Sequence, residues 1–320
     1  MPGVVHTDLL AAGIIGEPFA EFNELVQHWV ALENWTYSRT FSFNTTSSSS
    51  TLVFDGLDTY ANITLNGHHL GVAENAFLRW QTLVPPGLLR PGEDANELVV
   101  SFTNPQAVGQ TAAAAYPIPL REFRANRYSY SGRPFVRKSQ THFGWNWGPG
   151  YITQGIYRGV HLSTVASSGG SIDSVVVQQT GEAPDDDGLY NTTAWPPLPR
   201  TAPTSIKVTL DVEVRCAATT VESVMLVRAS LPIGTAKGEV KCPRGSAAGA
   251  LVSTTLALSV AVAPTAKAAQ LSLWYPNGYG EQALHKLEVT LCTTAGACAI
   301  PWSKPIGLRT AELVVQKRLS

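Results

Sequence analysis

The feature that most constrains this chain is a succession of short segments in which apolar and polar residues alternate. In the first half these segments are WTYSRTFSF, TLVFDGL, ANITL, HLGVA, WQTLV and ELVVSF. They are rich in β-branched and aromatic residues, and clusters of Ser, Gly, Pro and Asn separate them, which is typical of strands joined by turns. So many short strands at this spacing predict an antiparallel β-sandwich.

The clearest local prediction is a tight hairpin between ANITL and HHLGVA. Asn66-Gly67 joins the two segments, and both residue types tolerate the positive φ of a two-residue type I′ turn.

Helical periodicity is confined to residues 7–31. Thr7 and Asp8 can cap LLAAG, Gly13 can end that helix, and FAEFNELVQHWVALE spaces its apolar residues three and four apart. We therefore expect a short helical segment at the N-terminus, followed by β structure alone.

The length of 320 residues predicts two domains, since a typical domain has about 150 residues. The flexible run SSGG, Ser167 to Gly170, separates a first domain over 1–168 from a second over 171–320. The second half holds about seven strand-like segments, an immunoglobulin-like number: IDSVVVQQ, IKVTLDVEV, VESVMLVRA, ALSVAV, LSLWY, KLEVTL and AELVVQ.

The most apolar stretch, residues 247–263, also alternates. Leu256, Leu258, Val260 and Val262 fall on one side of an extended chain, which indicates a half-buried strand. A membrane-spanning helix needs about 20 apolar residues in a row.

Charge and ligand spacing exclude several classes of partner. The net charge is -1, from 23 basic and 24 acidic residues without long runs of one sign, so the chain lacks the field that attracts nucleic acid or anionic membranes. The CxxC spacing of zinc sites and the ligand spacing of an EF-hand around Asp185, Asp186 and Asp187 are both missing. We expect neither a metal nor another cofactor.

All four cysteines lie in the second half. Cys292 and Cys298 bracket a turn-like TTAGA, which would put them opposite each other on a hairpin, and Cys216 and Cys242 would form the remaining pair. Reduced, buried thiols in a cytosolic protein fit the sequence equally well.

Four sequons would suit a secretory route, although chance matches also fit a chain rich in Ser and Thr. They lie at Asn34, Asn44, Asn62 and Asn191. Met1 leads straight into PGVVHTDLL without the pattern of a signal peptide.

Four segments carry a resemblance to a known family. The segment from Phe54 to Phe102 closely resembles the N-terminal jelly-roll, galactose-binding-like domain of glycoside hydrolase family 2. The segment from Val136 to Leu162, with RK-Q followed by W-x-W-G-P, resembles the signature loop of the β-mannosidase branch. LWYPNGYGEQALHKLEV and GLRTAELV are similar to that family's immunoglobulin-like second domain and its exit strand.

The resemblance implies an all-β chain in which a jelly-roll sandwich precedes an immunoglobulin-like one. It also implies a retaining exo-glycosidase that removes terminal β-mannose with two glutamates on a (β/α)8 barrel after GLRTAELV. No such catalytic pair can be named in this sequence. Asn23-Glu24 and Asn96-Glu97 resemble the family's Asn-Glu dipeptide, but they fall in the helical segment and in the turn-strand ANELVVSF. We therefore expect a non-catalytic N-terminal fragment that is inactive alone and frames the barrel's active site.

One residue of this region is implied to reach the sugar. Asn146 stands where the family has an acidic residue that binds substrate hydroxyls; an amide can still donate and accept, but the charge-assisted bond is lost. Trp145 and Trp147 either offer an apolar face to a sugar ring or wedge the interface with the barrel. Arg137 and Lys138 are expected to orient the loop by salt bridges.

The implied partners are a β-mannoside oligosaccharide, bound by the full-length enzyme, and the intramolecular barrel. The implied location is lysosomal or secreted if the parent protein carries a signal peptide. Two other functions fit the sequence: a stand-alone, lectin-like carbohydrate-binding protein, and an adhesion protein of tandem sandwiches, which rests on fold analogy alone.

Overall fold

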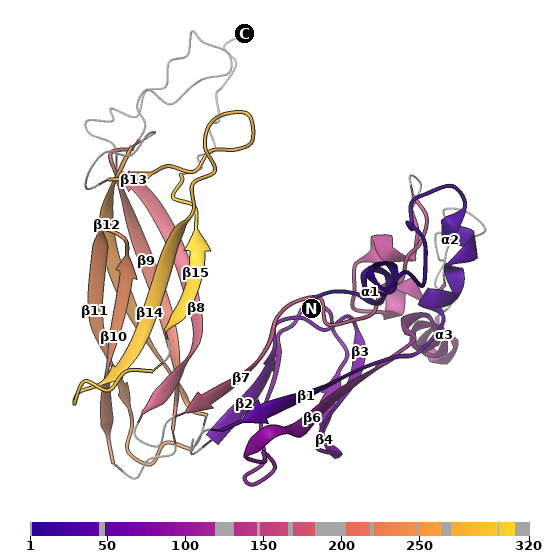
Figure 1. Cartoon of the computed structure of the whole chain (residues 1–320), viewed down its shortest axis with the longest axis horizontal. Helices are drawn as coiled ribbons and strands as arrows, with labels where there is room; N and C mark the ends of the chain where they lie inside the picture. The colour runs from indigo at the N-terminus through magenta and orange to yellow at the C-terminus, as the bar shows by residue number, and fades with distance from the viewer. Residues whose placement is uncertain are drawn as a thin grey trace. The chain divides into compact units, whose positions relative to one another are not determined.

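A computed structural model describes the chain in two compact units, Met1–Thr164 and Val165–Ser320 (Figure 1). The described residues are 2–44, 49–118, 131–145, 148–165, 169–182, 203–217, 221–247, 249–263, 270–299 and 301–310. The change of unit falls shortly before the predicted SSGG run. Both units are built mainly of β-strands, so the all-β prediction is confirmed.

The first unit is a sandwich of two sheets. One sheet has the order β1-β6-β3-β4 and the other the order β5-β2-β7. Phe54, Ile63 and Phe102 are buried in the core that the two sheets share. The strands are β1 (Trp35–Phe43), β2 (Ser49–Phe54), β3 (Tyr60–Leu65), β4 (His68–Ala73), β5 (Trp80–Leu83), β6 (Gly92–Thr103) and β7 (Val160–Val165).

The predicted hairpin is confirmed between β3 and β4. Leu65 pairs with His68, and the two turn residues have positive φ, 51° at Asn66 and 77° at Gly67. The Asn66 side chain also donates to the carbonyl of Leu88 at 2.7 Å and accepts from the N–H of Glu97 at 2.8 Å. The turn is thereby tied to the segment before β6 and to the middle of that strand.

The N-terminal helices differ from the prediction. The segment expected as one helix is broken into α2 (Asn23–Val26) and a 3-10 turn, η1 (His28–Ala31). A continuous α-helix would place Val26 and Val30 on the same face, yet Val26 is exposed and Val30 fully buried. Because the helix breaks near Gln27, Val30 can be buried in the core while Val26 stays on the surface.

The first helix, α1 (Val5–Ala11), also begins earlier than predicted. The Thr7 hydroxyl accepts from the N–H of Val4 at 3.0 Å from inside the helix, so Thr7 and Asp8 do not precede it as caps. Gly13, with a φ of 70°, follows the end of the helix as expected.

A third helix, α3 (Pro105–Ala115), was not predicted. The side chain of Asn104 accepts from the N–H groups of Gln106 and Ala107, and Pro105 occupies the first turn. Asn-Pro before QAVGQTAAAA is an ordinary helix start, so the signal was present in the sequence. Two short 3-10 turns, η2 (Arg133–Phe135) and η3 (Gln140–Phe143), follow. Among the residues the structure describes, no helix is long and apolar enough to cross a membrane.

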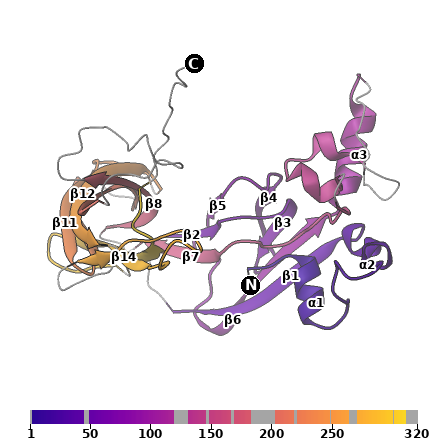
Figure 2. The same ribbon diagram turned by 90° about the horizontal axis from the view of Figure 1, so that it is seen from above.

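The second unit is also a two-sheet sandwich, with β12 and β8 on one side and β14 on the other (Figure 2). Its sheets have the orders β11-β10-β14-β15 and β13-β12-β9-β8. The strands are β8 (Gly170–Glu182), β9 (Ser205–Cys216), β10 (Ser223–Leu231), β11 (Gly234–Cys242), β12 (Leu251–Ala263), β13 (Leu271–Ser272), β14 (His285–Thr293) and β15 (Trp302–Ile306).

The period of two in the apolar stretch is confirmed in β12, where alternate side chains from Leu256 to Val262 are buried. The hairpin predicted around Cys292 and Cys298 is confirmed, with β15 as its second strand. Strand β11 was not predicted, and the predicted strand AELVVQ lies outside the described residues.

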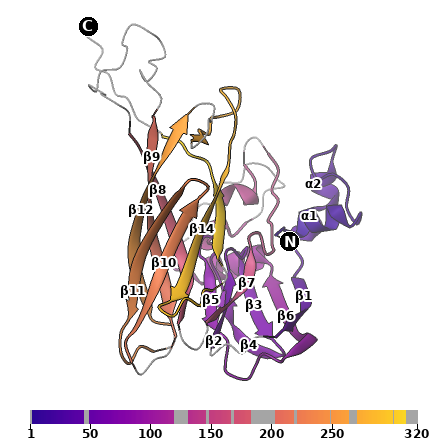
Figure 3. The same ribbon diagram turned by 60° about the vertical axis from the view of Figure 1, so that its left-hand side comes forward.

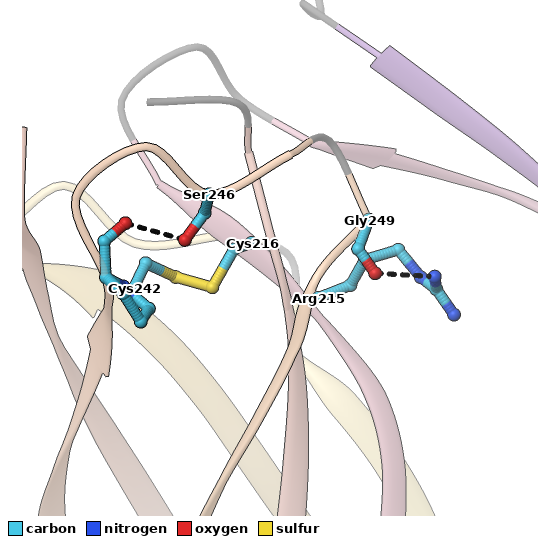
Figure 4. Close-up of a disulfide and its surroundings, with 6 residues drawn as sticks. Arg215, Cys216, Cys242, Ser246 and Gly249 are labelled. Atoms are coloured by element: carbon cyan, nitrogen blue, oxygen red, sulfur yellow. Dashed lines mark hydrogen bonds between the residues drawn. A yellow bond between two sulfur atoms is a disulfide. The ribbon is translucent and has the colours of Figure 1, made fainter. Parts of the chain in front are cut away.

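Both disulfides considered from the sequence are present. Cys216 is joined to Cys242, and Cys292 to Cys298 (Figure 4 shows the first). The first links the end of β9 to the end of β11 and therefore connects the two sheets of the sandwich. Beside it, Arg215 donates to the carbonyl of Gly249 at 3.2 Å (Figure 4).

Candidate functional site

The signature segment forms a loop with two arms that meet in a tight turn. Trp145 and Gly148 close this turn through two backbone hydrogen bonds, of 3.1 and 3.3 Å. The first arm holds η3 and Lys138, and the second arm holds Tyr151 to Ile156. Asn146 and Trp147, two of the three residues predicted to bind sugar, lie outside the described residues.

Both arms are fastened to one carboxylate, Asp58, in the turn after β2. From the first arm, the Lys138 ammonium lies 3.0 Å from Asp58 Oδ2. From the second arm, the Thr153 hydroxyl donates to the same oxygen at 2.6 Å. Lys138 also donates to the carbonyl and hydroxyl oxygens of Thr153, at 2.7 and 3.2 Å. We call Asp58, Lys138 and Thr153 the loop anchor.

The loop anchor is an internal ion pair with its hydrogen bonds satisfied. Lys138 is only 2 % exposed and Asp58 only 4 %. Burial lowers the pKa of Lys138, and the attraction and hydrogen bond of Asp58 oppose that shift. Three acceptors surround the three N–H groups of the ammonium, which compensates for the loss of water.

The predicted role of Lys138 as an orienting salt bridge is therefore confirmed. Arg137 behaves differently: its guanidinium lies 5.7 Å from the centre of the Phe77 ring.

Two histidines lie around the anchor. The Nδ1 atom of His142 is 3.1 Å from the Thr153 hydroxyl; because that hydroxyl gives its proton to Asp58, Nδ1 must be the donor. Burial and the charge of Lys138 lower the pKa of His142, and Asp58 opposes the shift.

The second histidine, His6 of α1, packs its ring edge-on against Tyr151 at 5.4 Å. Burial, Lys138 and His142 together lower the pKa of His6 to about 4. Among the described residues, neither ring nitrogen of His6 has a hydrogen-bond partner. The ring is therefore neutral at physiological pH.

A small apolar core holds the two arms together. Val136 and Phe143 of the first arm and Ile152 of the second pack with Ala31, next to Tyr60. The chain at the start of α1 is hydrogen-bonded to the second arm, because the N–H groups of Gly3 and Val5 donate to the carbonyls of Ile156 and Gln154 at 3.0 and 2.8 Å. These contacts make the base of the loop a rigid support for its tip.

Trp145 is partly buried, and the guanidinium of Arg133 lies 5.4 Å from the centre of its ring. This separation is within the roughly 6 Å at which a guanidinium is attracted to an aromatic face. Whether Trp145 contacts a sugar or an interface stays a prediction.

The two Asn-Glu dipeptides and the histidines of the β3–β4 hairpin lie in other elements than this loop. Glu24 belongs to α2, and Glu97 is an exposed residue of β6 that pairs with Thr40. His68 and His69 are exposed on the β3–β4 hairpin. No group of three His, Cys, Asp or Glu side chains within the described ranges could hold a metal ion.

Sequence reasoning missed Asp58, Thr153, His6 and Arg133. Asp58 and Lys138 are 80 residues apart, so no local pattern connects them. The one available signal was an acidic residue four positions after the end of an apolar strand, in VFDGLD.

Comparison with known proteins relates the first unit to a family. Residues 1–158 match the family described as glycosyl hydrolase 2 galactose-binding domain-like. Residues 1–158 therefore belong to the galactose-binding-like domain of glycosyl hydrolase 2.

Curated proteins similar to the whole chain include β-mannosidases. Beta-mannosidase B of Aspergillus flavus is 31% identical over 322 residues, which cover 99% of this chain and 33% of the relative. Beta-mannosidase B of Thermothelomyces thermophilus is 30% identical, covering 98% of this chain and 32% of the relative. The chain thus spans about a third of the length of the curated relatives it matches.

Solved structures are also similar to almost the whole chain, and the chain again covers about a third of each. The β-D-mannosidase of Dictyoglomus thermophilum is 29% identical, with a TM-score of 0.67 over 98% of this chain and 34% of that one. An exo-chitosanase from Amycolatopsis orientalis is 17% identical, with a TM-score of 0.58 over 96% of this chain and 29% of that one. At that identity the second likeness concerns the fold alone.

Proposed function

We propose that this chain is the non-catalytic N-terminal region of a β-mannosidase that removes terminal β-D-mannose from oligosaccharides or glycoproteins. The chemistry would belong to a (β/α)8 barrel elsewhere in the polypeptide, and the loop from Val136 to Leu162 would frame its mouth. The observation that carries the proposal is the match of both units, over 99% of the chain, to a third of a β-mannosidase.

The geometry of the loop supports this role. A residue that orients a substrate hydroxyl must be held to within a fraction of an ångström. The loop anchor fixes both arms of the turn that carries Asn146, and the Val136, Phe143 and Ile152 side chains fill the space between the arms. Such a support suits a residue that contributes position to a site built largely by another domain.

The first test is enzymatic. The 320-residue chain should give no hydrolysis of an aryl β-D-mannoside above a buffer blank, whereas the longer polypeptide encoded by the same transcript should hydrolyse it. Turnover by the 320-residue chain, or an inactive longer polypeptide, would refute the proposal. High-affinity binding of the isolated chain on a glycan array would instead favour the lectin-like alternative.

The Asn146 position allows a finer test of the same proposal. In the longer polypeptide, Asn146→Asp should strengthen binding of a β-mannoside about fivefold, because a charge-assisted hydrogen bond contributes about 1 kcal/mol more than a neutral one. Inhibition constants for mannose-like inhibitors would measure this. The exposed residue Asn62 provides the control, Asn62→Asp. Equal affinity in the two variants would contradict the role of Asn146.

We also propose that the protein matures in an oxidising compartment, secreted or lysosomal. The two disulfides support this location, because such bonds persist outside reducing cytosol. Asn34, Asn44 and Asn62 are exposed, as glycan acceptors must be, and Asn191 lies outside the described residues. Protein from its native host should lose mass on treatment with an N-glycosidase; an unchanged mass together with free thiols would contradict the proposal.

A further inference from the structure

The outer side of the N-terminal helical segment exposes four large apolar side chains. Ile14 is 64% exposed, Phe19 79%, Phe22 72% and Val26 71%. We call these four residues the N-terminal apolar face. Single exposed apolar residues are common on protein surfaces, but several within one short segment indicate an interaction site.

This face is part of a folded element rather than a loose end. The inner side of the same segment buries Val5, Leu9, Ile15 and Val30 in a core of their own. α1 and α2 lie beside each other at one end of the first unit (Figure 3).

Side-chain hydrogen bonds also fix the connection between the two helices. Asn23 donates to the carbonyl of Glu17 at 2.7 Å, and Gln27 donates to the carbonyl of Gly16 at 3.0 Å. The exposed phenylalanines are therefore held in place before any partner arrives, which lowers the entropy cost of binding.

The charge around the face restricts what can cover it. The first 38 residues contain no Lys or Arg. They contain five acidic residues, of which Glu17, Glu21 and Glu24 are interleaved with the exposed apolar side chains. A complementary partner surface must be apolar at its centre and basic at its rim. A second copy of this segment would instead bring like charges together.

The N-terminal apolar face is continuous with the loop from Val136 to Leu162, which we call the tryptophan loop. Phe19 packs edge-on against Tyr151 of the second arm at 5.5 Å, and the Tyr151 hydroxyl donates to the carbonyl of Pro18. A body that packs on the loop beside Tyr151 would therefore also meet Phe19. The curated relatives are about three times as long as this chain, so they contain further polypeptide that could supply this body.

We propose that the N-terminal apolar face packs against the (β/α)8 barrel of the same polypeptide, on an apolar surface rimmed by Lys and Arg. This inference rests on the proposed function and adds a second contact area next to the tryptophan loop. The helical segment would then help to hold the loop in place against the barrel.

Hydrogen exchange on the 320-residue chain and on the longer polypeptide tests the inference. Peptides covering residues 14–32 should exchange roughly tenfold or more slowly in the longer polypeptide, because the barrel would cover them. Phe19→Ser/Phe22→Ser should remove that protection. It should lower the melting temperature of the longer polypeptide by more than that of the 320-residue chain, which loses only the contact of Phe19 with Tyr151. The control is Val72→Ser/Val176→Ser, which alters two exposed apolar residues on strands β4 and β8. It should leave the protection of residues 14–32 intact.

The outcomes separate this inference from the proposed function. Equal exchange of residues 14–32 in the two proteins would overturn the inference, even if the longer polypeptide hydrolyses an aryl β-mannoside. An inactive longer polypeptide that still protects the segment would overturn the proposed function alone. A dimer of the 320-residue chain that Phe19→Ser/Phe22→Ser dissociates would assign the face to a second copy and would also overturn the inference.

Discussion

At the scale of single residues, the loop anchor concentrates an unusual amount of buried charge. Asp58 receives Lys138 and the hydroxyl of Thr153, and the hydroxyl of Thr59 donates to its other carboxylate oxygen at 2.5 Å. A buried ion pair of this kind adds little compared with apolar packing, but removing one partner strands a charge in the interior. The buried ion pair therefore serves the protein mainly by fixing the position of the loop.

Replacing Lys138 should consequently be costly. Lys138→Met leaves Asp58 unpaired and should lower the free energy of unfolding by about 3–5 kcal/mol. Urea unfolding followed by tryptophan fluorescence would measure the loss. Asp58→Asn/Lys138→Met should be less destabilised than Lys138→Met alone, because no uncompensated charge remains.

The matched control is Lys286→Met. Lys286 forms an ion pair with Glu288 on the surface, where its side chain is 66% exposed. Exposed pairs of this type contribute about 1 kcal/mol or less. Losses of similar size in Lys138→Met and Lys286→Met would contradict the importance assigned to the anchor.

His6 should make stability depend on pH. Its pKa is about 4 in the folded chain, against an ordinary value near 6.5. Between these values the unfolded chain binds a proton that the folded chain does not, so stability is complete above about pH 6.5 and falls as the pH drops toward 4. The loss should reach about 3 kcal/mol at most.

His6→Phe, which keeps an aromatic ring beside Tyr151, should flatten this dependence. Unfolding free energies measured from pH 7.5 to 4.5 would test the prediction. The exposed residue His68 provides the control, His68→Phe, which should retain the slope of the original chain. A slope that His6→Phe leaves unchanged would show that other groups take up the proton.

At the scale of elements, the two disulfides differ in what they connect. Cys216–Cys242 closes a separation of 26 residues and joins two sheets, whereas Cys292–Cys298 closes only 6 residues beside one hairpin. Loop-closure entropy predicts a loss of about 3–4 kcal/mol when the first is removed and about 2 kcal/mol for the second.

Denaturant unfolding of Cys216→Ala/Cys242→Ala and of Cys292→Ala/Cys298→Ala would compare the two. The first pair should be the more destabilised, also because both of its sulfur atoms are buried in the core. The reverse order would show that strain or structure in the unfolded chain outweighs loop entropy.

Elements set by local pattern were predictable from the sequence, and those set by distant contacts were not. The Asn66-Gly67 hairpin and the alternation of β12 depend on neighbouring residues and appear as expected. The break after α2 depends on which apolar residue the interior accepts, and the loop anchor joins residues 80 apart. Strand β11 was missed because GTAKGEVKC has a weak apolar face, of which only Val240 and Cys242 are buried.

At the scale of the whole molecule, each unit has a core of its own. The core of the first unit is formed by the inner faces of its two sheets, and that of the second unit contains residues from β9, β10, β12 and β14. A unit with an independent core can fold alone.

A chain cut between Thr164 and Val165 should therefore yield a second half that folds by itself. Residues 165–320, expressed under oxidising conditions, should unfold cooperatively on heating and give dispersed amide signals by NMR. Gradual, non-cooperative melting would show that this half needs the first one.

The cysteines have a practical consequence at this scale. All four occur after residue 215, so the first unit has no sulfur chemistry of this kind. A mild reductant is thus an agent that weakens one half of the polypeptide and leaves the other untouched. In melting experiments at increasing reductant concentration, the transition whose midpoint falls would be that of the second unit, and the transition that does not move would be that of the first.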